Sequence, residues 1–303
     1  MGGPAVTVLD FPAARVRVGG STIAAAAGIS PWCSRVELYY RLTGVLPEPD
    51  TEALWWGKRV QPLIFDRLRE DGYTVQECPP EFTLADDRLP WLEGHPDGIW
   101  SDDAANIVEA KLSGGRTYRH DDPLPIDWQA QVQTYMRLGD CDRALVAVCH
   151  AGTRLDVHEV HFDERAASRL VELAGEFVAM VEEGVPPPPD GSESARKTLG
   201  YVFPAQTPGK LHRLLGASWE AYRQLREWRE AEARCKERVQ ALENTLKAEV
   251  GDAETVIGPH DEEVATWKQQ TARRIDTKRL RAEHPEIAAS YETEIPTRVW
   301  RLK

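Results

Sequence analysis

The sequence predicts an α/β fold in which a central mixed sheet is flanked by helices, followed by a long coiled-coil-like helix and a small α+β tail. Short runs of strand-forming residues alternate with amphipathic helical patterns through residues 1–204, as in a sheet covered by helices. The run Pro186–Pro189 and the turn-forming residues behind it end this pattern and indicate a surface linker. We therefore expect a core over 1–204, a long helix over 205–252 and a basic tail over 253–303.

The elements of the core follow from spacing and capping residues. Apolar residues at helical spacing, with caps such as Ser21 and stops such as Gly44 and Gly72, predict helices. The helices are expected at Ser21–Ala27, Ser34–Leu42, Glu52–Glu70, Trp128–Leu138 and Glu164–Glu182. Runs rich in strand formers predict strands at Tyr73–Gln76, Glu81–Leu84, His95–Trp100, Asn106–Lys111, Ala144–His150 and Leu155–Phe162.

The residues after the linker predict one long helix, Leu211–Val250. Within it Trp228, Glu232, Cys235, Val239, Leu242 and Leu246 follow one another at steps of three and four, the spacing of a coiled-coil seam. A helix of this length needs another helix or another chain to cover the seam. The tail is expected to hold strands at Glu263–Lys268, Thr271–Ile275 and Arg298–Leu302, and a short helix capped by Asp276 or Thr277.

Composition excludes several classes of protein. The 303 residues, of which 42% are apolar and 28% charged, contain no apolar run of membrane-spanning length, and residues 1–14 lack the pattern of a secretory signal. The five cysteines form no CxxC pair, which argues against a disulfide framework, a zinc ribbon or an iron–sulfur cluster. We expect a cytoplasmic protein without a membrane segment, whose thiols are reduced and mostly buried.

The net charge of −12 argues against nucleic acid as a partner, but the charge is unevenly distributed. Acidic residues outnumber basic ones in residues 1–204, whereas the two kinds nearly balance in 205–303. The acidic excess is either a solvated surface or part of a cation site. The basic residues between Lys268 and Lys303 form either a solvated face or a surface that follows DNA phosphates.

The residues most informative about chemistry are Asp97, Glu109 and Lys111. Asp97 lies near the start of one predicted strand and Glu109 and Lys111 lie near the end of the next, so a hairpin brings the two carboxylates to one face. Ala110 points to the other face. Buried carboxylates beside a lysine need a compensating cation, and hard oxygen ligands suit Mg²⁺ or Mn²⁺. A bound cation would stabilise a phosphate and activate water, which the lysine can orient or deprotonate.

This Pro-Asp … Glu-x-Lys pattern resembles the signature of the PD-(D/E)xK nuclease superfamily, which has a restriction-endonuclease-like core. Further segments resemble the YqaJ-type phage recombinase nucleases, relatives of lambda exonuclease, and occur in that family's order. These segments are Gly28-Ile29-Ser30-Pro31-Trp32, Ala53-Leu54-Trp55-Trp56-Gly57-Lys58, Gly94-His95-Pro96-Asp97-Gly98 and Trp128-Gln129-Ala130-Gln131-Val132-Gln133-Thr134-Tyr135. The resemblance covers about Val18 to Phe203.

The resemblance implies a role for each matching residue of the catalytic centre. Asp97, Glu109 and the Ala110 carbonyl would hold Mg²⁺, with Mn²⁺ as a substitute and two ions in all, and Lys111 would be the catalytic lysine. Gln131 and Tyr135 would contact the phosphate at the scissile end, with Gln131 supporting the lysine. The alternative for this pair is an ordinary helix face packed on the sheet.

Other positions are implied to bind DNA. Ser21, with Arg15 or Arg17, resembles a pocket for the 5′-phosphate, although Ser21 alone is equally explained as a helix N-cap. Trp32 either stacks on an unpaired base or fills the core under a loop. Relatives carry a glutamate where this sequence has Gln61, which we interpret as tuning the second metal.

The function that the resemblance implies is a 5′-to-3′ exonuclease on double-stranded DNA ends. It would leave 3′ overhangs for a single-strand annealing protein and act as a ring-shaped homo-oligomer. Two alternatives stay open: an endonuclease on flaps or branched DNA that uses the same core, and a DNA-end-binding assembly factor without turnover.

Overall fold

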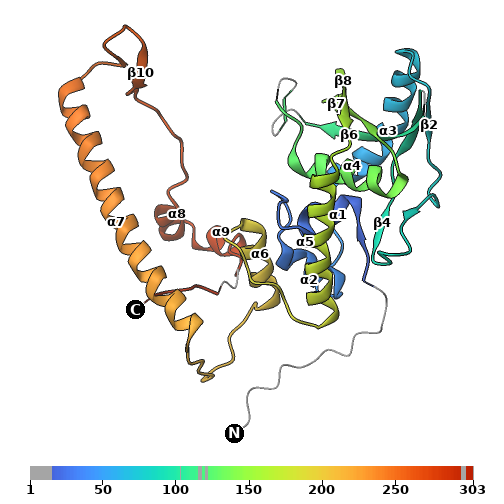
Figure 1. Ribbon diagram of the computed structural model, residues 1–303. Helices are drawn as coiled ribbons and strands as arrows, with labels where there is room; N and C mark the ends of the chain where they lie inside the picture. The colour runs from blue at the N-terminus through green and yellow to red at the C-terminus, as the bar shows by residue number, and fades with distance from the viewer. Residues whose placement is uncertain (1–15, 103, 115–117, 120–121, 295–297, 303) are drawn as a thin grey trace. The chain divides into compact units, whose positions relative to one another are not determined.

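The computed structural model describes residues 16–102, 104–114, 118–119, 122–294 and 298–302 (Figure 1). The chain divides into two compact units, the first ending at Phe203 and the second beginning at Pro204. Arg15, one of the two candidates for the 5′-phosphate pocket, lies outside the described residues.

The main sheet of the first unit has the strand order β2-β5-β6-β7-β8 in the described part of the chain. β6 and β7 run parallel, and the other neighbouring strands run antiparallel. The strands are β2 (Val75–Glu77), β5 (Gly98–Ser101), β6 (Ala105–Ser113), β7 (Arg143–His150) and β8 (Arg154–His161). A central mixed sheet flanked by helices is thus confirmed.

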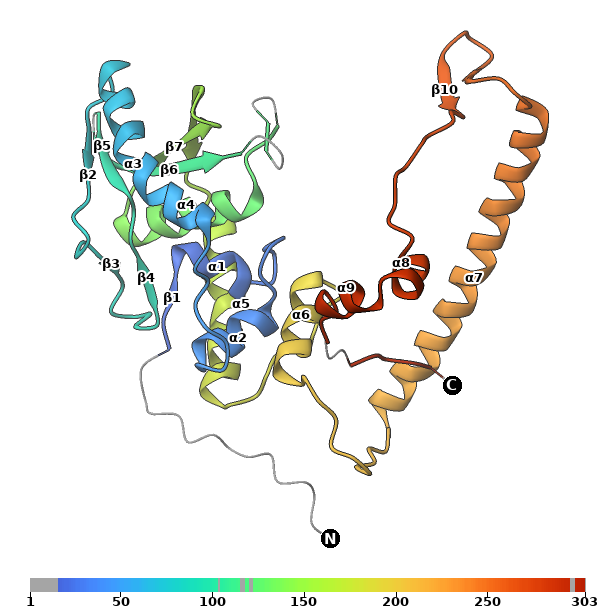
Figure 2. The same ribbon diagram turned by 180° about the vertical axis from the view of Figure 1, so that it is seen from behind.

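Two helices cover the two faces of this sheet (Figure 2). Because successive side chains of a strand point to opposite faces, Val108 of β6 packs against α3 (Glu52–Glu70), while Ile107 packs against α4 (Ile126–Gly139). Glu109 and Lys111 lie two and four residues after Ile107 in β6, so they point to the same face as Ile107. Their side chains therefore belong to the face that α4 covers.

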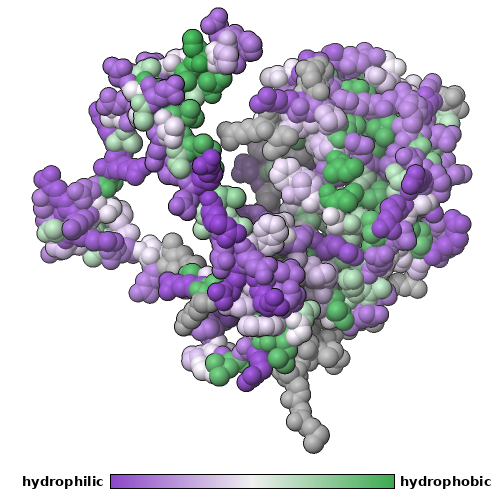
Figure 3. All heavy atoms as spheres, turned by 60° about the vertical axis from the view of Figure 1, so that its left-hand side comes forward, coloured by the Kyte–Doolittle hydropathy of each residue, from purple (hydrophilic) through white to green (hydrophobic). Residues whose placement is uncertain are grey.

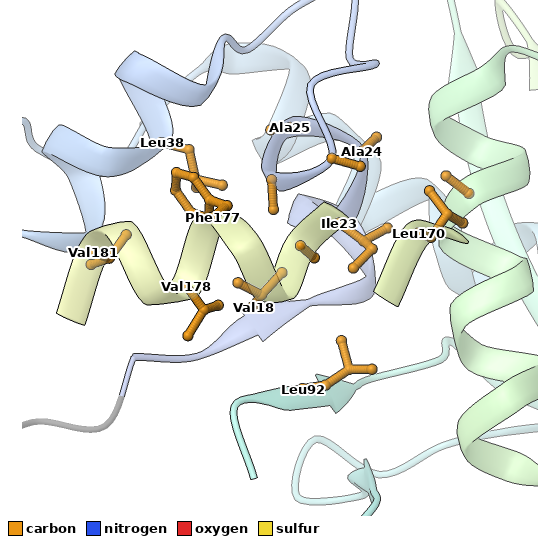
Figure 4. Packing of buried hydrophobic residues seen from close by; sticks show 14 of the residues in the cluster. Val18, Ile23, Ala24, Ala25, Leu38, Leu92, Leu170, Phe177, Val178 and Val181 are labelled. Atoms are coloured by element: carbon orange, nitrogen blue, oxygen red, sulfur yellow. The ribbon is translucent and has the colours of Figure 1, made fainter. Parts of the chain in front are cut away.

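The remaining elements of the first unit build a second core around α5 (Glu164–Glu182), as Figure 4 shows. Phe177 is fully buried and lies in one cluster with Ile23, Leu38 and Leu92. The cluster draws on α1 (Gly20–Ala26), α2 (Arg35–Leu42) and a small sheet of order β1-β4-β3, with β1 at Val18–Gly19, β4 at Leu92–Gly94 and β3 at Leu84–Ala85.

Three details of the first unit differ from the sequence-based expectation. The N-cap of α1 is Gly19 and not Ser21, because the Thr22 hydroxyl accepts the Gly19 amide hydrogen bond at 3.0 Å. β5 begins at Gly98 and not at His95, since Pro96 has no N–H to donate to a neighbouring strand. The expected linker continues into α6 (Glu193–Val202), which Ser192 caps and which packs against α2.

The second unit contains the confirmed long helix, α7 (Ala217–Val250). It begins at Ala217 and not at Leu211 because Gly216 has a positive φ of 55°, which interrupts the helical backbone. A hairpin of β9 (Thr255–Ile257) and β10 (Glu263–Thr266) follows, and then α8 (Thr277–Glu283), capped by Asp276, and α9 (Pro285–Ser290).

Two strands expected in the tail, Thr271–Ile275 and Arg298–Leu302, are absent from the described residues. Almost every residue of these segments is exposed, so neither has a surface on which a strand face could be buried. Basic residues of the tail pair with acidic neighbours, as Lys268 does with Glu254 at 2.8 Å and Arg279 with Glu283 at 2.7 Å.

All five cysteines are free thiols. The expectation that most are buried is wrong, because four are half-buried and Cys235 is exposed. Across the described residues, no helix combines the length and the apolar composition that crossing a membrane requires.

Candidate active site

The antiparallel hairpin of β5 and β6 sets the two candidate metal ligands opposite each other. Gly98 pairs with Val108, so Asp97, one residue before β5, comes level with Glu109. The Ala110 amide donates a hydrogen bond to Asp97 Oδ2 at 2.8 Å, which ties this carboxylate to the next strand. The contact to the Ala110 backbone arises from strand register and does not depend on the alanine side chain.

Lys111, Glu109 and Gln131 form a closed hydrogen-bond network between β6 and α4. The Lys111 ammonium donates to Glu109 Oε1 at 2.7 Å and to Gln131 Oε1 at 2.8 Å. The Gln131 amide donates in turn to Glu109 Oε1 at 2.8 Å and to the Tyr135 hydroxyl at 3.0 Å. Gln131 therefore fixes both the lysine and the glutamate, as a supporting residue would.

The second oxygen of Glu109 indicates that the network is incomplete without a ligand. Glu109 is 4% exposed, and its Oε2 atom is buried with no hydrogen-bond partner among the described residues. A buried carboxylate oxygen without a partner is costly, and a hard cation is the natural partner for it. The described residues hold no cluster of three or more His, Cys, Asp or Glu side chains. A cation here would accordingly need the two carboxylates, backbone oxygen, water or a substrate phosphate.

The pKa of Asp97 also fits a cation bound beside Glu109. Burial, and after it the neighbouring Glu109 carboxylate, raises the pKa of Asp97 to about 7, against the lowering effects of the Ala110 amide and Lys111. Two carboxylates that repel each other in a partly dry site are the setting that a divalent cation stabilises. The residues present fit a bound magnesium or manganese ion.

Tyr135 connects this network to the start of α1. Its side chain is 2% exposed, and burial raises the pKa of its phenol above the usual value, so the hydroxyl keeps its proton. A Cβ atom on Gly20 would overlap the Tyr135 ring, and one on Gly94 would lie 2.8 Å from it. Glycine at both positions lets the ring reach Gln131. Ser21 follows Gly20 directly in α1.

Three further candidates have surroundings of their own outside the hydrogen-bond network of Lys111, Glu109 and Gln131. Arg17 pairs with Glu93 at 2.5 Å. Trp32 is 62% exposed, which excludes the core-filling alternative, and it lines a surface cavity of about 670 Å³ between α2 and α6. Gln61 is half-buried on α3, the helix on the opposite face of the sheet from α4.

Trp128 is a neighbour of the site that sequence reasoning missed. Its ring centroid lies 6.0 Å from the Lys111 nitrogen, within reach of a cation–π contact. The signal was available, because Trp128, Gln131 and Tyr135 are three and four residues apart and so share one face of α4.

Comparison with known proteins shows which family the segment that holds these residues resembles. Residues 11–142, which include every candidate site residue, match the YqaJ-like viral recombinase domain. Over 298 residues the chain is 26% identical to the protein YqaJ of Bacillus subtilis (strain 168), a match that covers 95% of this chain and 92% of the relative.

Solved structures similar to this chain include two exonucleases. An alkaline exonuclease from Laribacter hongkongensis matches with a TM-score of 0.45 and 19% identity, over 57% of this chain and 91% of that chain. A phage-related exonuclease from Haemophilus somnus 129PT matches with a TM-score of 0.42 and 12% identity, over 56% of this chain and 96% of that chain.

Proposed function

We propose that this protein is a magnesium-dependent deoxyribonuclease that degrades the 5′-ended strand of double-stranded DNA from its ends and leaves 3′ overhangs. The observation that carries the proposal is the buried, unpartnered Glu109 Oε2 beside Asp97 and Lys111. These three residues lie in the segment that matches the YqaJ-like viral recombinase domain. Degradation of one strand is a reaction that recombination requires. Mn²⁺ would substitute for Mg²⁺, and the site would hold two ions.

Each residue of the network has a definable task in phosphodiester hydrolysis. Asp97, Glu109 and the Ala110 carbonyl would hold the ion, which when bound supplies Lewis acidity to the phosphate and to a coordinated water. The Lys111 ammonium, fixed by Glu109 and Gln131, orients the attacking water beside the phosphate. Tyr135 holds the Gln131 amide from its far side, so the lysine keeps its direction while substrate enters.

Substrate topology tests the proposal most simply. Purified protein should be incubated with linear, nicked and covalently closed duplexes, with Mg²⁺ and with EDTA in its place. We expect degradation of the linear duplex, none of the closed circle, and no cleavage in EDTA. Cutting of the closed circle would instead identify an endonuclease on this core. Binding of linear ends without any cutting would identify an assembly factor.

We propose that Ser21, together with Arg15 or Arg17, recognises the 5′ end of the DNA. We expect duplexes with a 5′-phosphate to be degraded faster than those with a 5′-hydroxyl, and Ser21→Ala to reduce this preference by roughly tenfold or more. A charge-assisted hydrogen bond is worth about 1.5–3 kcal/mol, and about 1.4 kcal/mol corresponds to tenfold. The measurement is the ratio of the two degradation rates.

Thr22→Ala is the matched control for Ser21→Ala. Because the Thr22 hydroxyl satisfies the Gly19 amide while Ser21 is exposed, loss of Thr22 should lower the melting temperature and leave the rate ratio unchanged. Ser21→Ala should leave the melting temperature unchanged and lower the rate ratio. An unchanged rate ratio in Ser21→Ala removes this residue from the end-binding site.

Gln61 is proposed to lie beside the second metal and to tune its affinity. We expect Gln61→Glu to lower the Mg²⁺ concentration that gives half-maximal rate, because an added carboxylate strengthens a hard-cation site. Gln270→Glu, which adds the same charge to an exposed position of the second unit, should leave that concentration unchanged. Equal Mg²⁺ dependence in both variants would mean that Gln61 is not next to the metal.

The same function makes Trp32 and Tyr135 candidates for DNA contact and implies two kinds of protein partner. The exposed ring of Trp32 is available to stack on an unpaired base, whereas Tyr135 is buried and would act through Gln131. The 3′ overhang is the substrate of a single-strand annealing protein, and the nuclease would work as a homo-oligomer around DNA.

A further inference from the structure

The helix α7 exposes a seam of mostly apolar residues. Its members, spaced alternately three and four residues apart, are Leu225, Trp228, Glu232, Cys235, Val239, Leu242 and Leu246, which we call the α7 seam. No residue of α7 is buried, and Trp228, Val239 and Leu246 are all more than half exposed. Apolar side chains lie open among hydrophilic ones on the face shown in Figure 3. An exposed seam of this regularity is the surface of a coiled coil that lacks its partner.

The length of α7 restricts what can cover the α7 seam. Its 34 residues correspond to about 50 Å of helix. Among the described residues of the same unit, α8 has 7 residues and α9 has 6, which is too short. In the first unit α3 and α5 reach 19 residues each, and both already contribute buried side chains to the cores of that unit. The helix that matches α7 in length and spacing is α7 of another copy.

We propose that two copies of this chain associate through α7 as a parallel, in-register coiled coil. The spacing assigns Leu225, Glu232, Val239 and Leu246 to the a positions, and Trp228, Cys235 and Leu242 to the d positions. A β-branched residue at a followed by leucine at d, as in Val239 and Leu242, favours parallel two-stranded coils. This proposal rests on the seam alone and does not depend on the nuclease function.

Charges beside the α7 seam are compatible with this arrangement. Arg238 occupies a g position and Glu243 the e position five residues later, so in a parallel pair each Arg238 faces Glu243 of the other copy. Glu232 is the polar member of the seam, and Arg229 and Lys236 pair with it on its own helix at 2.9 and 2.6 Å. A single polar a position fixes register at some cost in stability.

Molar mass in solution tests the proposal. Val239→Lys combined with Leu242→Lys places charge in the α7 seam, whereas Gln240→Lys combined with Asn244→Lys adds the same charge on the other face of the same turns. We expect the seam variant to fall to half the molar mass of the wild type and the control to keep it. Lysine is a good helix former, so far-UV circular dichroism should show equal helix content in both. A seam variant with wild-type mass, or a wild type that is monomeric at every concentration, overturns the proposal.

Cys235 reports on direction and register. In a parallel, in-register pair the two Cys235 residues share one d layer, close enough for a disulfide. We expect mild oxidation of the full-length protein to give a dimer that reducing agent separates and that Cys235→Ser does not form. Failure of the wild-type dimer to cross-link, or cross-linking that persists in Cys235→Ser, would contradict the parallel arrangement.

Discussion

Replacing Lys111 with alanine should lower the rate of DNA cleavage at saturating Mg²⁺ by 100-fold or more, with little change in folding or DNA affinity. A positioned group that handles the attacking water typically contributes at least this factor. The Lys111 ammonium is held by Glu109 and Gln131, so it has a fixed direction that alanine cannot reproduce. Asp97→Ala and Glu109→Ala should abolish cleavage because each removes a metal ligand.

The measurement for these variants is single-turnover cleavage of a linear duplex, with binding measured separately in Ca²⁺ or EDTA. Lys247→Ala, which removes an exposed lysine of α7, is the control and should cleave at the wild-type rate. A Lys111→Ala protein that keeps more than about a tenth of the wild-type rate would remove the lysine from the catalytic centre.

Replacing Asp97 with asparagine should abolish cleavage and yet stabilise the metal-free protein at pH 8. The pKa of Asp97 in the folded protein, about 7, lies above the value of an exposed aspartate, so folding favours the protonated carboxyl. The stabilising contribution is complete below the unfolded pKa, about 4, and is lost as the pH rises through 7. Asparagine stays neutral and still accepts the Ala110 amide. We expect a melting temperature about 5 °C higher than that of the wild type.

The difference in melting temperature between the wild type and Asp97→Asn should depend on pH and on Mg²⁺, and this dependence makes the test specific for the Asp97 carboxylate. Below pH 4 the wild-type carboxyl is protonated in both the folded and the unfolded state, so the two melting temperatures should converge. Mg²⁺ should raise the melting temperature of the wild type at pH 8 and leave that of Asp97→Asn nearly unchanged. Asp66→Asn, at an exposed position of α3, is the control. Equal wild-type and Asp97→Asn melting temperatures at pH 8 without metal would contradict the raised pKa that burial and the neighbouring Glu109 give Asp97.

The hairpin that brings Asp97 and Glu109 together could be predicted from sequence because it depends on local alternation. Asp97 and Glu109 are twelve positions apart on adjacent strands, and the two-residue period of a strand fixes their common face. The role of Gln131 came from the family resemblance. The network itself needed the structure, because it depends on how α4 lies on β6, and no spacing within either element specifies that contact.

Elements set by tertiary contacts were not predictable. β1 has two residues and pairs with β4, seventy-four positions later, so no local pattern marks either strand. The start of α6 has the serine, glycine and aspartate composition of a linker, and its packing on Ser34 stabilises it as a helix. Ser21 looked like an N-cap because serine is a common one, but the fold gives capping to Gly19 with the hydroxyl of Thr22.

Asp97 and Glu109 are expected to bind a divalent cation, and a crystal grown with Mn²⁺ tests this expectation directly. An anomalous difference map recorded near the manganese edge should show a peak within about 2.0–2.3 Å of Glu109 Oε2 and of an Asp97 oxygen. The peak should disappear in crystals of Asp97→Asn. A map without a peak between these two carboxylates, from a protein that still cleaves DNA, would contradict the account.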